Sequence, residues 1–190
     1  MPLFIRTFVC VELPEQHRRT LAVTLKSLKK NFSEIKWVSP QTLHLTLKFC
    51  GEQSEDTIGC FSSYIKEELQ LRRLDPFLIT LGSAGAFPSL KRPRTLWIGV
   101  TEGGDPLLSL VELVEKAGLR AGVEKEKRIF HPHLTLARIR PGTFVSPQLE
   151  EELGRQNFNS LSWKVSSIVL MKSELRPEGA QHTPLETYSL

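Results

Sequence analysis

The sequence of 190 residues contains few cysteines and no long apolar run. Its three cysteines (Cys10, Cys50 and Cys60) are odd in number and show no C-x-x-C spacing. This pattern argues against a disulfide framework or a zinc site, and it favours buried thiols in a reducing compartment. The longest apolar runs, such as Ile168–Met171, fall far short of the roughly 20 residues of a membrane span. We therefore expect a soluble, cytoplasmic protein with no membrane segment and no secretory leader.

Glycine and proline, with 12 residues each, are too few for a fibrous or disordered chain. The length suits one compact domain or two small lobes that share a core. Lysine and arginine number 25 against 21 acidic residues, which gives a formal net charge of +4. This mild excess is compatible with an anionic ligand. Most basic pairs lie in predicted helices and are expected to be solvated, whereas the Lys-Arg-Pro-Arg segment at 91–94 lies in a predicted loop and suits either an anion contact or plain solvation.

The spacing of apolar residues predicts the order strand, helix, strand, helix, strand, and predicts it twice. A loop is expected over Gly82–Gly85, and Asp105 is the expected cap of the first helix in the second round. The strands expected are Leu3–Val11, Leu43–Phe49, Phe77–Leu81, Thr95–Thr101, His133–Ile139 and Trp163–Met171. The helices expected begin at Glu15, Glu55, Pro106 and Pro147.

One tetrapeptide occurs in each round, as His44-Leu45-Thr46-Leu47 and as His133-Leu134-Thr135-Leu136. The second histidine and the second threonine follow the first ones at the same separation. We interpret this repetition as an internal duplication. No Gly/Ser-rich linker divides the halves, so we expect residues 1–190 to form one unit of two lobes related by a pseudo-twofold axis.

The repeated motif has the residues of an acid–base pair. Side chains alternate along a strand, so His44 shares one face with Thr46, and His133 shares one with Thr135, while the leucines occupy the opposite faces. Two histidines across a cleft can act as base and acid near neutral pH. Threonine hydroxyls can donate hydrogen bonds to phosphoryl oxygens. A single His-x-Thr is usually structural, but its recurrence at matching positions favours catalysis on a phosphodiester.

Further segments accompany the two motifs. They are Arg6–Val9, Glu12–Pro14, Trp37-Val38, Leu43–Phe49, Gly51-Glu52, Phe87-Pro88, Pro93-Arg94, Leu96–Val100, Phe130–Arg138, Ser173–Leu175 and Gly179-Ala180. In this order they closely resemble the 2H phosphoesterase superfamily, and within it the RNA 2′,3′-cyclic phosphodiesterase family, also called 2′-5′ RNA ligase. The resemblance covers nearly the whole chain.

The resemblance implies hydrolysis of a terminal 2′,3′-cyclic phosphate to a 2′-phosphate, without a metal or other cofactor. It implies that His44 protonates the departing 3′ oxygen and that His133 orients and deprotonates the attacking water, although the opposite pairing of roles remains open. Thr46 and Thr135 would donate hydrogen bonds to the phosphate. Arg138 would neutralise its charge.

For two basic residues near the motifs, the face of the sheet that the side chain occupies depends on whether the strand is regular. Strict alternation places Ala137 rather than Arg138 on the face of His133, so Arg138 reaches the site only if the strand ends or bulges there. Otherwise Arg138 is a surface or lobe-bridging residue. The same counting places Lys48 on the face of His44, either as an anion contact or at a solvated strand end.

Three further residues are candidate nucleotide contacts. Phe49 and Phe130 flank the motifs and can either line a wall for the terminal base or pack in the core. His182 stands where relatives often carry tyrosine, and its ring can stack on a base. A zinc site at the His-x-His of His131 and His133 is disfavoured, because no nearby cysteine or carboxylate supplies further ligands.

The complete expectation is an α+β protein of two pseudo-symmetric lobes, each a mainly antiparallel sheet covered by helices, with the active site in the groove between them. The expected partner is RNA that ends in a 2′,3′-cyclic phosphate, with tRNA fragments as examples, and the expected state is a monomer. Reversible 2′-5′ ligation is left open. The alternatives are a 2H enzyme for 2′-5′-linked oligoadenylate or small cyclic nucleotides, and an RNA-end-binding protein with little turnover.

Overall fold

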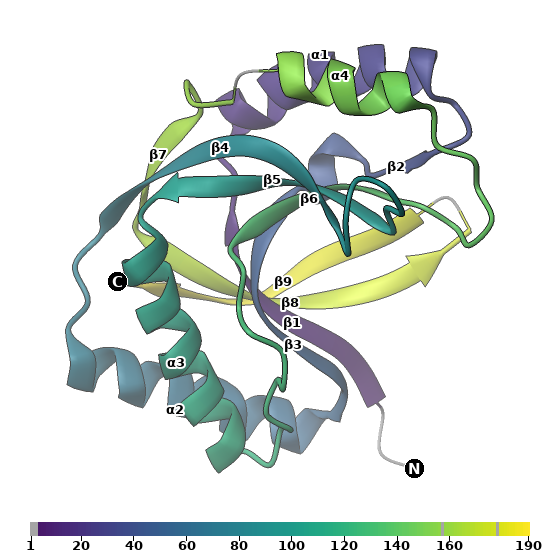
Figure 1. Cartoon of the computed structure of the whole chain (residues 1–190). Helices are drawn as coiled ribbons and strands as arrows, with labels where there is room; N and C mark the ends of the chain where they lie inside the picture. Colours follow the sequence, from purple (N-terminus) through teal and green to yellow (C-terminus); the bar gives the residue numbers. More distant parts are fainter. Residues whose placement is uncertain (1–3, 157, 178) are drawn as a thin grey trace.

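The computed structural model describes residues 4–156, 158–177 and 179–190. In these residues four α-helices accompany one antiparallel sheet of nine strands (Figure 1). The strands are β1 (Phe4–Glu12), β2 (Lys36–Trp37), β3 (His44–Ser54), β4 (Phe77–Phe87), β5 (Thr95–Glu102), β6 (His133–Arg138), β7 (Ser162–Val165), β8 (Ser167–Arg176) and β9 (Gly179–Ser189). The helices are α1 (Glu15–Asn31), α2 (Glu55–Arg72), α3 (Gly104–Arg120) and α4 (Pro147–Arg155), with a 3-10 turn η1 (Pro40–Thr42). None of the helices described is long and apolar enough to cross a membrane.

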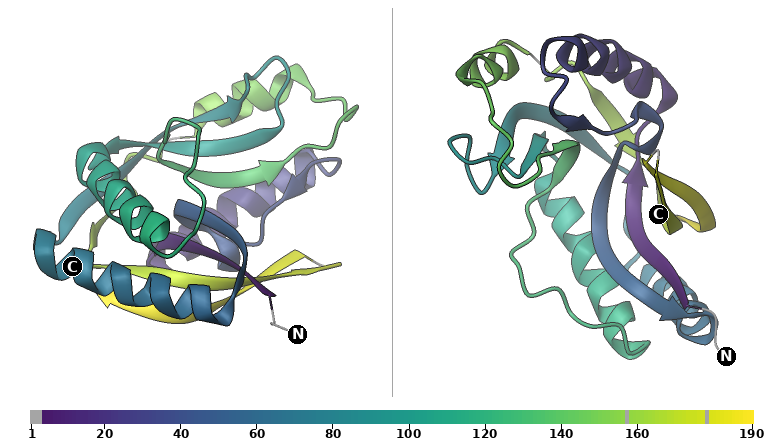
Figure 2. Two further views of the ribbon diagram at one scale, coloured as in Figure 1. Left: turned by 90° about the horizontal axis from the view of Figure 1, so that it is seen from below. Right: turned by 90° about the vertical axis from the view of Figure 1, so that its right-hand side faces the viewer.

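The shortest strand pairing in the sheet lies where the two motifs meet. Its strands follow the order β7-β4-β5-β6-β3-β1-β8-β9, with β2 paired to β6. β3 and β6 pair only at Leu45 and Leu134. This junction divides the sheet into a first lobe of β1, β3, β8 and β9, and a second lobe of β2 and β4–β7. Only Ser166 separates β7 from β8, although these strands lie far apart in the order, so the sheet is strongly curled (Figures 1 and 2).

The two halves of the chain exchange helices. α1 belongs to the first half, yet it lies beside α4 over the second lobe (Figures 1 and 2), where His17 contacts the Ser162 carbonyl oxygen at 2.9 Å. α3 belongs to the second half, yet it packs with α2 against β3 of the first lobe. The α+β class and the twofold order of elements are confirmed. Each lobe nevertheless contains elements from both halves of the sequence.

The motif leucines belong to the main hydrophobic core. Leu45, Leu47, Leu134 and Leu136 are all at most 4% exposed and join one cluster between the sheet and the helices. Each fully buried leucine contributes roughly 1.5–3 kcal/mol to folding. A second, smaller cluster of Phe8, Cys10, Val169 and Met171 lies on the other face of the first lobe, where Phe8 stacks on His44. The core therefore holds one face of each motif, and the histidine-bearing faces remain outside it.

Two predicted strand boundaries in the sequence are wrong. The expected loop at Gly82–Gly85 is part of β4. Glycine occurs here because the Trp97 ring lies over the strand, and a Cβ on Gly85 would sit 2.4 Å from that ring. The expected strand at 163–171 is two strands, β7 and β8, interrupted at Ser166.

The ends of the chain and of α3 also differ from expectation. β9 was not predicted, since its polar, proline-containing sequence lacks strand alternation; it is an edge strand, where proline is tolerated. α3 begins at Gly104, and Gly103 at φ +84° precedes it, so Asp105 lies inside the first turn rather than at the cap. Leu3, the first residue of the expected N-terminal strand, lies outside the described residues.

A buried ion pair fastens α3 to β3. The Lys48 ammonium is fully buried and donates to both carboxylate oxygens of Glu115 at 2.9 Å and to the Glu124 carbonyl oxygen at 2.7 Å. The Glu115 side chain is 12% exposed. This contact links the first-half strand to the second-half helix that covers it.

We predict that Lys48→Met lowers the free energy of unfolding by about 3–5 kcal/mol, because it leaves the Glu115 carboxylate buried without its cation. Urea denaturation measures this loss. The control is Lys66→Met, which removes a pair of similar length with Glu186 (3.0 Å) whose side chains are 52% and 39% exposed. The control loss should stay below about 1 kcal/mol. Equal losses in the two variants would contradict the prediction.

Candidate active site

The two motifs lie side by side across the junction of the lobes. Since Leu45 pairs with Leu134 in antiparallel register, each histidine lies opposite the threonine of the other motif. The leucines of both motifs are buried and the histidines and threonines are partly exposed. Two imidazoles and two hydroxyls therefore share the face of the sheet that the core does not occupy.

Each histidine ring is oriented by a backbone carbonyl two residues earlier. Nδ1 of His44 lies 2.7 Å from the Thr42 oxygen, and Nδ1 of His133 lies 2.6 Å from the His131 oxygen. A carbonyl oxygen can only accept, so Nδ1 of each ring carries a hydrogen. Nε2 is then the nitrogen that exchanges a proton with a substrate. The two motifs repeat not only a sequence but also a tautomer.

Aromatic rings enclose both histidines. His44 stacks on Phe8 with 4.6 Å between ring centroids, and the edge of His182 approaches it at 5.3 Å. Phe87 presents its ring edgewise to His133 at 5.1 Å. Burial lowers the pKa of His44 to about 4 and also lowers the pKa of His133, because a low-dielectric surrounding disfavours the charged ring. Both imidazoles are neutral at pH 7 in the ligand-free protein.

A β-bulge carries Arg138 to the side of His133. Thr135 pairs with Trp97 and Ala137 pairs with Leu96, so Leu136 is the extra residue on β6. The bulge inverts the alternation, which buries Ala137 and turns Arg138 outward on the face of Thr135. The positive charge of Arg138 contributes to lowering the pKa of both histidines, so it acts on both rings. The structure therefore contains the bulge that Arg138 needs in order to lie on the face of His133.

The same bulge at the matching position of β3 overturns the predicted face of Lys48. Thr46 pairs with Cys10 and Lys48 pairs with Val9, so Leu47 is the extra residue. Lys48 consequently points into the core toward Glu115, away from the histidines. Phe49 takes the outward position, where it is 44% exposed and lies 4.5 Å below the Arg6 guanidinium.

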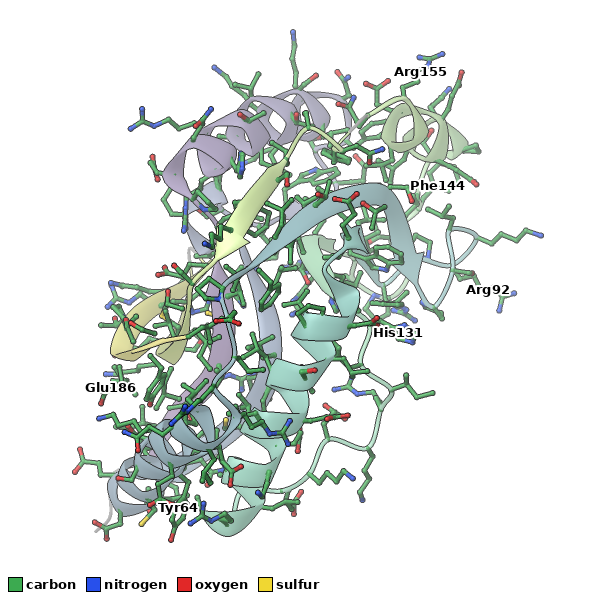
Figure 3. The ribbon with its side chains drawn as sticks, turned by 90° about the vertical axis from the view of Figure 1, so that its left-hand side faces the viewer. Tyr64, Arg92, His131, Phe144, Arg155 and Glu186 are labelled. Carbon is green, nitrogen blue, oxygen red and sulfur yellow. The ribbon has the colours of Figure 1, made fainter. Side chains whose placement is uncertain are left out.

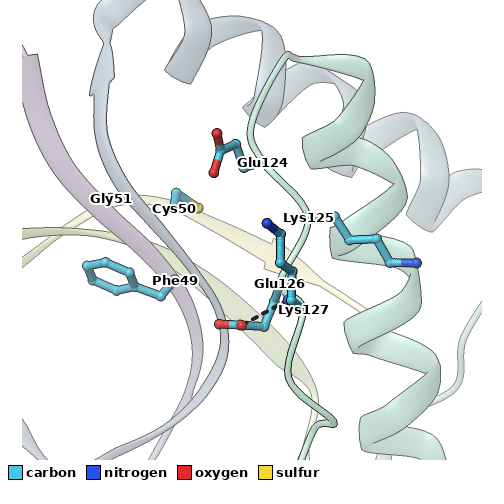
Figure 4. A pocket seen from close by; sticks show the side chains of 7 residues that line it. All are labelled: Phe49, Cys50, Gly51, Glu124, Lys125, Glu126 and Lys127. Carbon is cyan, nitrogen blue, oxygen red and sulfur yellow. Dashed lines mark hydrogen bonds between the residues drawn. The ribbon is translucent and has the colours of Figure 1, made fainter.

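Two hollows lie beside the motif strands β3 and β6. One, of about 320 Å³, lies beside His133; His131, labelled in Figure 3, is one of its lining residues. It is lined by Gly82, Ser83, Phe87, Trp97, Gly99, Val100, Thr101, His131, Pro132 and His133. The other, of about 390 Å³, separates β3 from the segment after α3 (Figure 4) and is lined by Phe49, Cys50, Gly51 and Glu124–Lys127.

Of the other predicted nucleotide contacts, one lies at the site and one does not. His182 lies at the site, against His44 and Phe8. Phe130 is half-buried and packs against the main core. Sequence reasoning assigned no role to Phe8, Phe87 or Trp97, because an aromatic residue in a strand reads equally well as core. Within the described ranges, no cluster of three or more His, Cys, Asp or Glu side chains is arranged to hold a metal ion.

Residues 14–177 match the family described as the 2′-5′ RNA ligase superfamily. The chain belongs to this superfamily. Among curated relatives in it, the RNA 2′,3′-cyclic phosphodiesterase of Methanothermobacter thermautotrophicus is 32% identical over 187 residues, which cover 98% of this chain and 99% of the relative. The protein of the same name from Thermus thermophilus is 36% identical over 199 residues, covering 98% of this chain and 90% of the relative.

Solved structures of other proteins share this fold. TT0787 of Thermus thermophilus matches with a TM-score of 0.77 and 31% identity over 98% of both chains. LigT of E. coli, solved in complex with 3′-AMP, matches with a TM-score of 0.76 and 25% identity over 99% of both chains. The similarity extends over the whole chain rather than over the motifs alone.

The half-buried, neutral His44 should make stability depend on pH. Below about pH 6.5 the unfolded chain binds a proton on this ring, whereas the folded protein resists it down to a pKa of about 4. Stability is therefore fully present above pH 6.5 and falls as the pH drops toward 4, by about 2–3 kcal/mol from this group. We predict a smaller loss between pH 7 and 4.5 in His44→Gln than in the unmodified protein, measured by urea denaturation. An identical loss in the two would contradict this.

Proposed function

We propose that this protein hydrolyses the 2′,3′-cyclic phosphate at an RNA end to a 2′-phosphate by metal-independent acid–base catalysis. The carrying observation is the pair of imidazoles whose Nδ1 atoms are both fixed by backbone carbonyls, at 2.7 and 2.6 Å. The two relatives described above bear the name RNA 2′,3′-cyclic phosphodiesterase. Phosphodiester hydrolysis needs one proton removed from water and one supplied to the leaving oxygen, and two such histidines meet that need.

In the proposed reaction the cyclic phosphate lies between the histidines. Nε2 of His133 takes a proton from water as the water oxygen attacks phosphorus, and the bond from phosphorus to the 3′ oxygen breaks. Nε2 of His44 donates its proton to that oxygen. The hydroxyls of Thr46 and Thr135 donate hydrogen bonds to the non-bridging oxygens, and Arg138 balances their charge. The product is a 2′-phosphate, and the histidines exchange the transferred proton with solvent.

His44 must gain a proton before it can act as the acid. Its pKa of about 4 in the ligand-free protein makes the neutral form dominant at pH 7. A bound phosphate anion favours the imidazolium, because an opposite charge within about 4–6 Å raises the pKa of a histidine. Proton uptake by His44 is then coupled to substrate binding, and both imidazoles stay neutral while the site is empty.

The proposed roles also assign the two sides of the groove. If His44 faces the ribose oxygen, then the terminal nucleoside lies on its side, where Phe49 and His182 offer rings for base stacking. Lys48 and Phe130 are not part of this proposal, since both face the core. We propose RNA fragments as the substrates, a monomer as the acting form, and the cytoplasm as the location.

A second candidate function, reversible 2′-5′ ligation, is favoured by the hollow beside His133. Water needs no aromatic recess of about 320 Å³, whereas a nucleoside whose 5′-hydroxyl replaces water does. Cleavage of a 2′-5′-linked dinucleotide, assayed beside a 2′-5′ oligoadenylate and a small cyclic nucleotide, separates these activities. Turnover of the cyclic phosphate alone would exclude ligation.

We predict that His44→Ala and His133→Ala each reduce turnover by several orders of magnitude while the fold persists. The assay is hydrolysis of a short RNA ending in a 2′,3′-cyclic phosphate with a chelator present, and the product is compared with 2′- and 3′-phosphate standards. His17→Ala is the matched control, because that ring contacts Ser162 and Trp163 in the second lobe. Near-normal turnover by either folded site variant would refute the proposal, and a 3′-phosphate product would reverse the leaving-group assignment.

Arg18 should act as a positioning residue for His44. Its guanidinium donates to the carbonyl oxygens of Gln41, within η1, and Leu13, and the last residue of η1 supplies the oxygen that binds Nδ1 of His44. We predict that Arg18→Gln lowers kcat about 10- to 100-fold with little change in KM, since misorientation by about 1 Å is enough for such a loss. The control is Arg19→Gln, which removes only an exposed pair with Glu15 at 3.0 Å. A parallel loss in thermal stability without a kcat change would assign Arg18 a purely structural role.

A further inference from the structure

Six exposed basic side chains gather at one end of the second lobe, and we call them the basic rim. Its members are Lys36, Lys91, Arg92, Arg94, Arg138 and Arg140. They come from three segments far apart in the sequence: β2, the loop between β4 and β5, and the end of β6 with the residues after it. The fold therefore concentrates charges that the sequence disperses.

Backbone pairing brings these segments together. Lys36 and Thr95 both pair with Arg138 across the sheet. The Arg94 amide donates to the Phe87 carbonyl at 2.7 Å, and the Arg94 carbonyl accepts from the Ile139 amide at 2.9 Å. Figure 3 shows Arg92 on a loop that projects beyond the sheet on the same side as His131.

The rim lacks the counter-charges found elsewhere on the molecule. No rim side chain forms a salt bridge with any acidic residue in the described part of the chain. Most other arginines do, namely Arg18, Arg19, Arg72, Arg120, Arg128, Arg155 and Arg176. Like charges held close without carboxylates repel one another and create a positive field, which an anionic partner relieves.

The rim is continuous with the histidine pair. Arg138 is its inner member and shares a face with Thr135 and His133, and Arg140 lies two residues further along the same chain direction. An extended chain advances about 3.3 Å per residue. Successive members of the rim therefore lie at increasing distances from the histidines. Arg92 and Arg94 lie before β5 and Arg140 lies after β6, so these three outer members come from beyond the strand ends rather than from the motif itself.

We propose that the basic rim binds the phosphate backbone of the RNA strand adjoining the reacting end. This inference rests on the proposed function for its ligand, and it adds that the protein distinguishes an RNA strand from a mononucleotide. Arginine suits the contact because its planar guanidinium binds phosphate oxygens in pairs. Contacts to the backbone carry no sequence information, so the rim would accept RNA of any sequence.

The test compares two substrates, a nucleoside 2′,3′-cyclic phosphate and an RNA octamer that ends in the same group. In the double variant Arg92→Gln/Arg94→Gln we expect kcat/KM on the octamer to fall at least tenfold at low salt, while the value on the mononucleotide stays within about twofold. The slope of log kcat/KM against log salt for the octamer should become shallower by about 1.4, because each phosphate contact to a single strand contributes about 0.7. The matched control is Lys29→Gln/Lys30→Gln, which removes two exposed charges from α1 and should change neither value.

Three results would overturn the proposal: equal losses on both substrates, a loss in the control as large as in the rim variant, or an octamer that the unmodified protein uses no better than the mononucleotide. If neither substrate is turned over, the proposed function fails and the rim is tested by binding alone. Fluorescence anisotropy with an RNA octamer ending in a 3′-phosphate then gives the dissociation constant. Binding weakened at least tenfold in the rim variant, but not in the control, would support the rim, and unchanged binding would refute it.

Discussion

The pairing of Leu45 with Leu134 is the contact on which the geometry of the site depends. It joins β3 to β6 at a single position, and it is the point where the two parts of the sheet meet. Because both leucines enter the same core, both histidines must lie on the opposite face. A shift of one residue on either strand would turn a histidine into the core and a leucine into the groove. Burial of the leucines thus fixes which side chains face a substrate.

The repeated bulge then decides what surrounds the histidines. Leu47 and Leu136 are each the extra residue of their strand, and each inverts the alternation that follows. On β6 the inversion brings out Arg138, and on β3 it brings out Phe49 and buries Lys48. A pseudo-symmetric backbone therefore presents a cation in one lobe and an aromatic ring in the other. This asymmetry is what a phosphate attached to a nucleoside requires, since one end of the ligand is charged and the other is a flat ring.

The order of elements and the reacting residues could be predicted because they depend on local pattern. Helical spacing gave the starts of α1, α2 and α4 at Glu15, Glu55 and Pro147, and strand alternation placed histidine with threonine. The bulges could not be predicted, because the apolar residues around Leu47 and Leu136 read as regular strand with or without an insertion. Exchange of α1 and α3 between the lobes also escapes the sequence, since periodicity shows that a helix has an apolar face but not which sheet that face covers. The polar edge strand β9 was missed because its sequence has no strand pattern; its pairing with β8 rather than its composition makes it a strand.

In the proposed reaction the charges of the rim and the histidines of the site act one after the other. The histidines are neutral in the empty protein because burial lowers their pKa values, so they add nothing to the attraction of an anion from solution. The exposed, unpaired charges of the rim act over a Debye length of about 8 Å at physiological salt and attract the strand first. Only when the terminal phosphate reaches the groove does its charge favour protonation of an imidazole. A histidine kept permanently charged by a neighbouring carboxylate would be protonated whether or not substrate is bound. A groove without the rim would have no positive charge to attract the RNA end, which would then reach the histidines by unassisted diffusion.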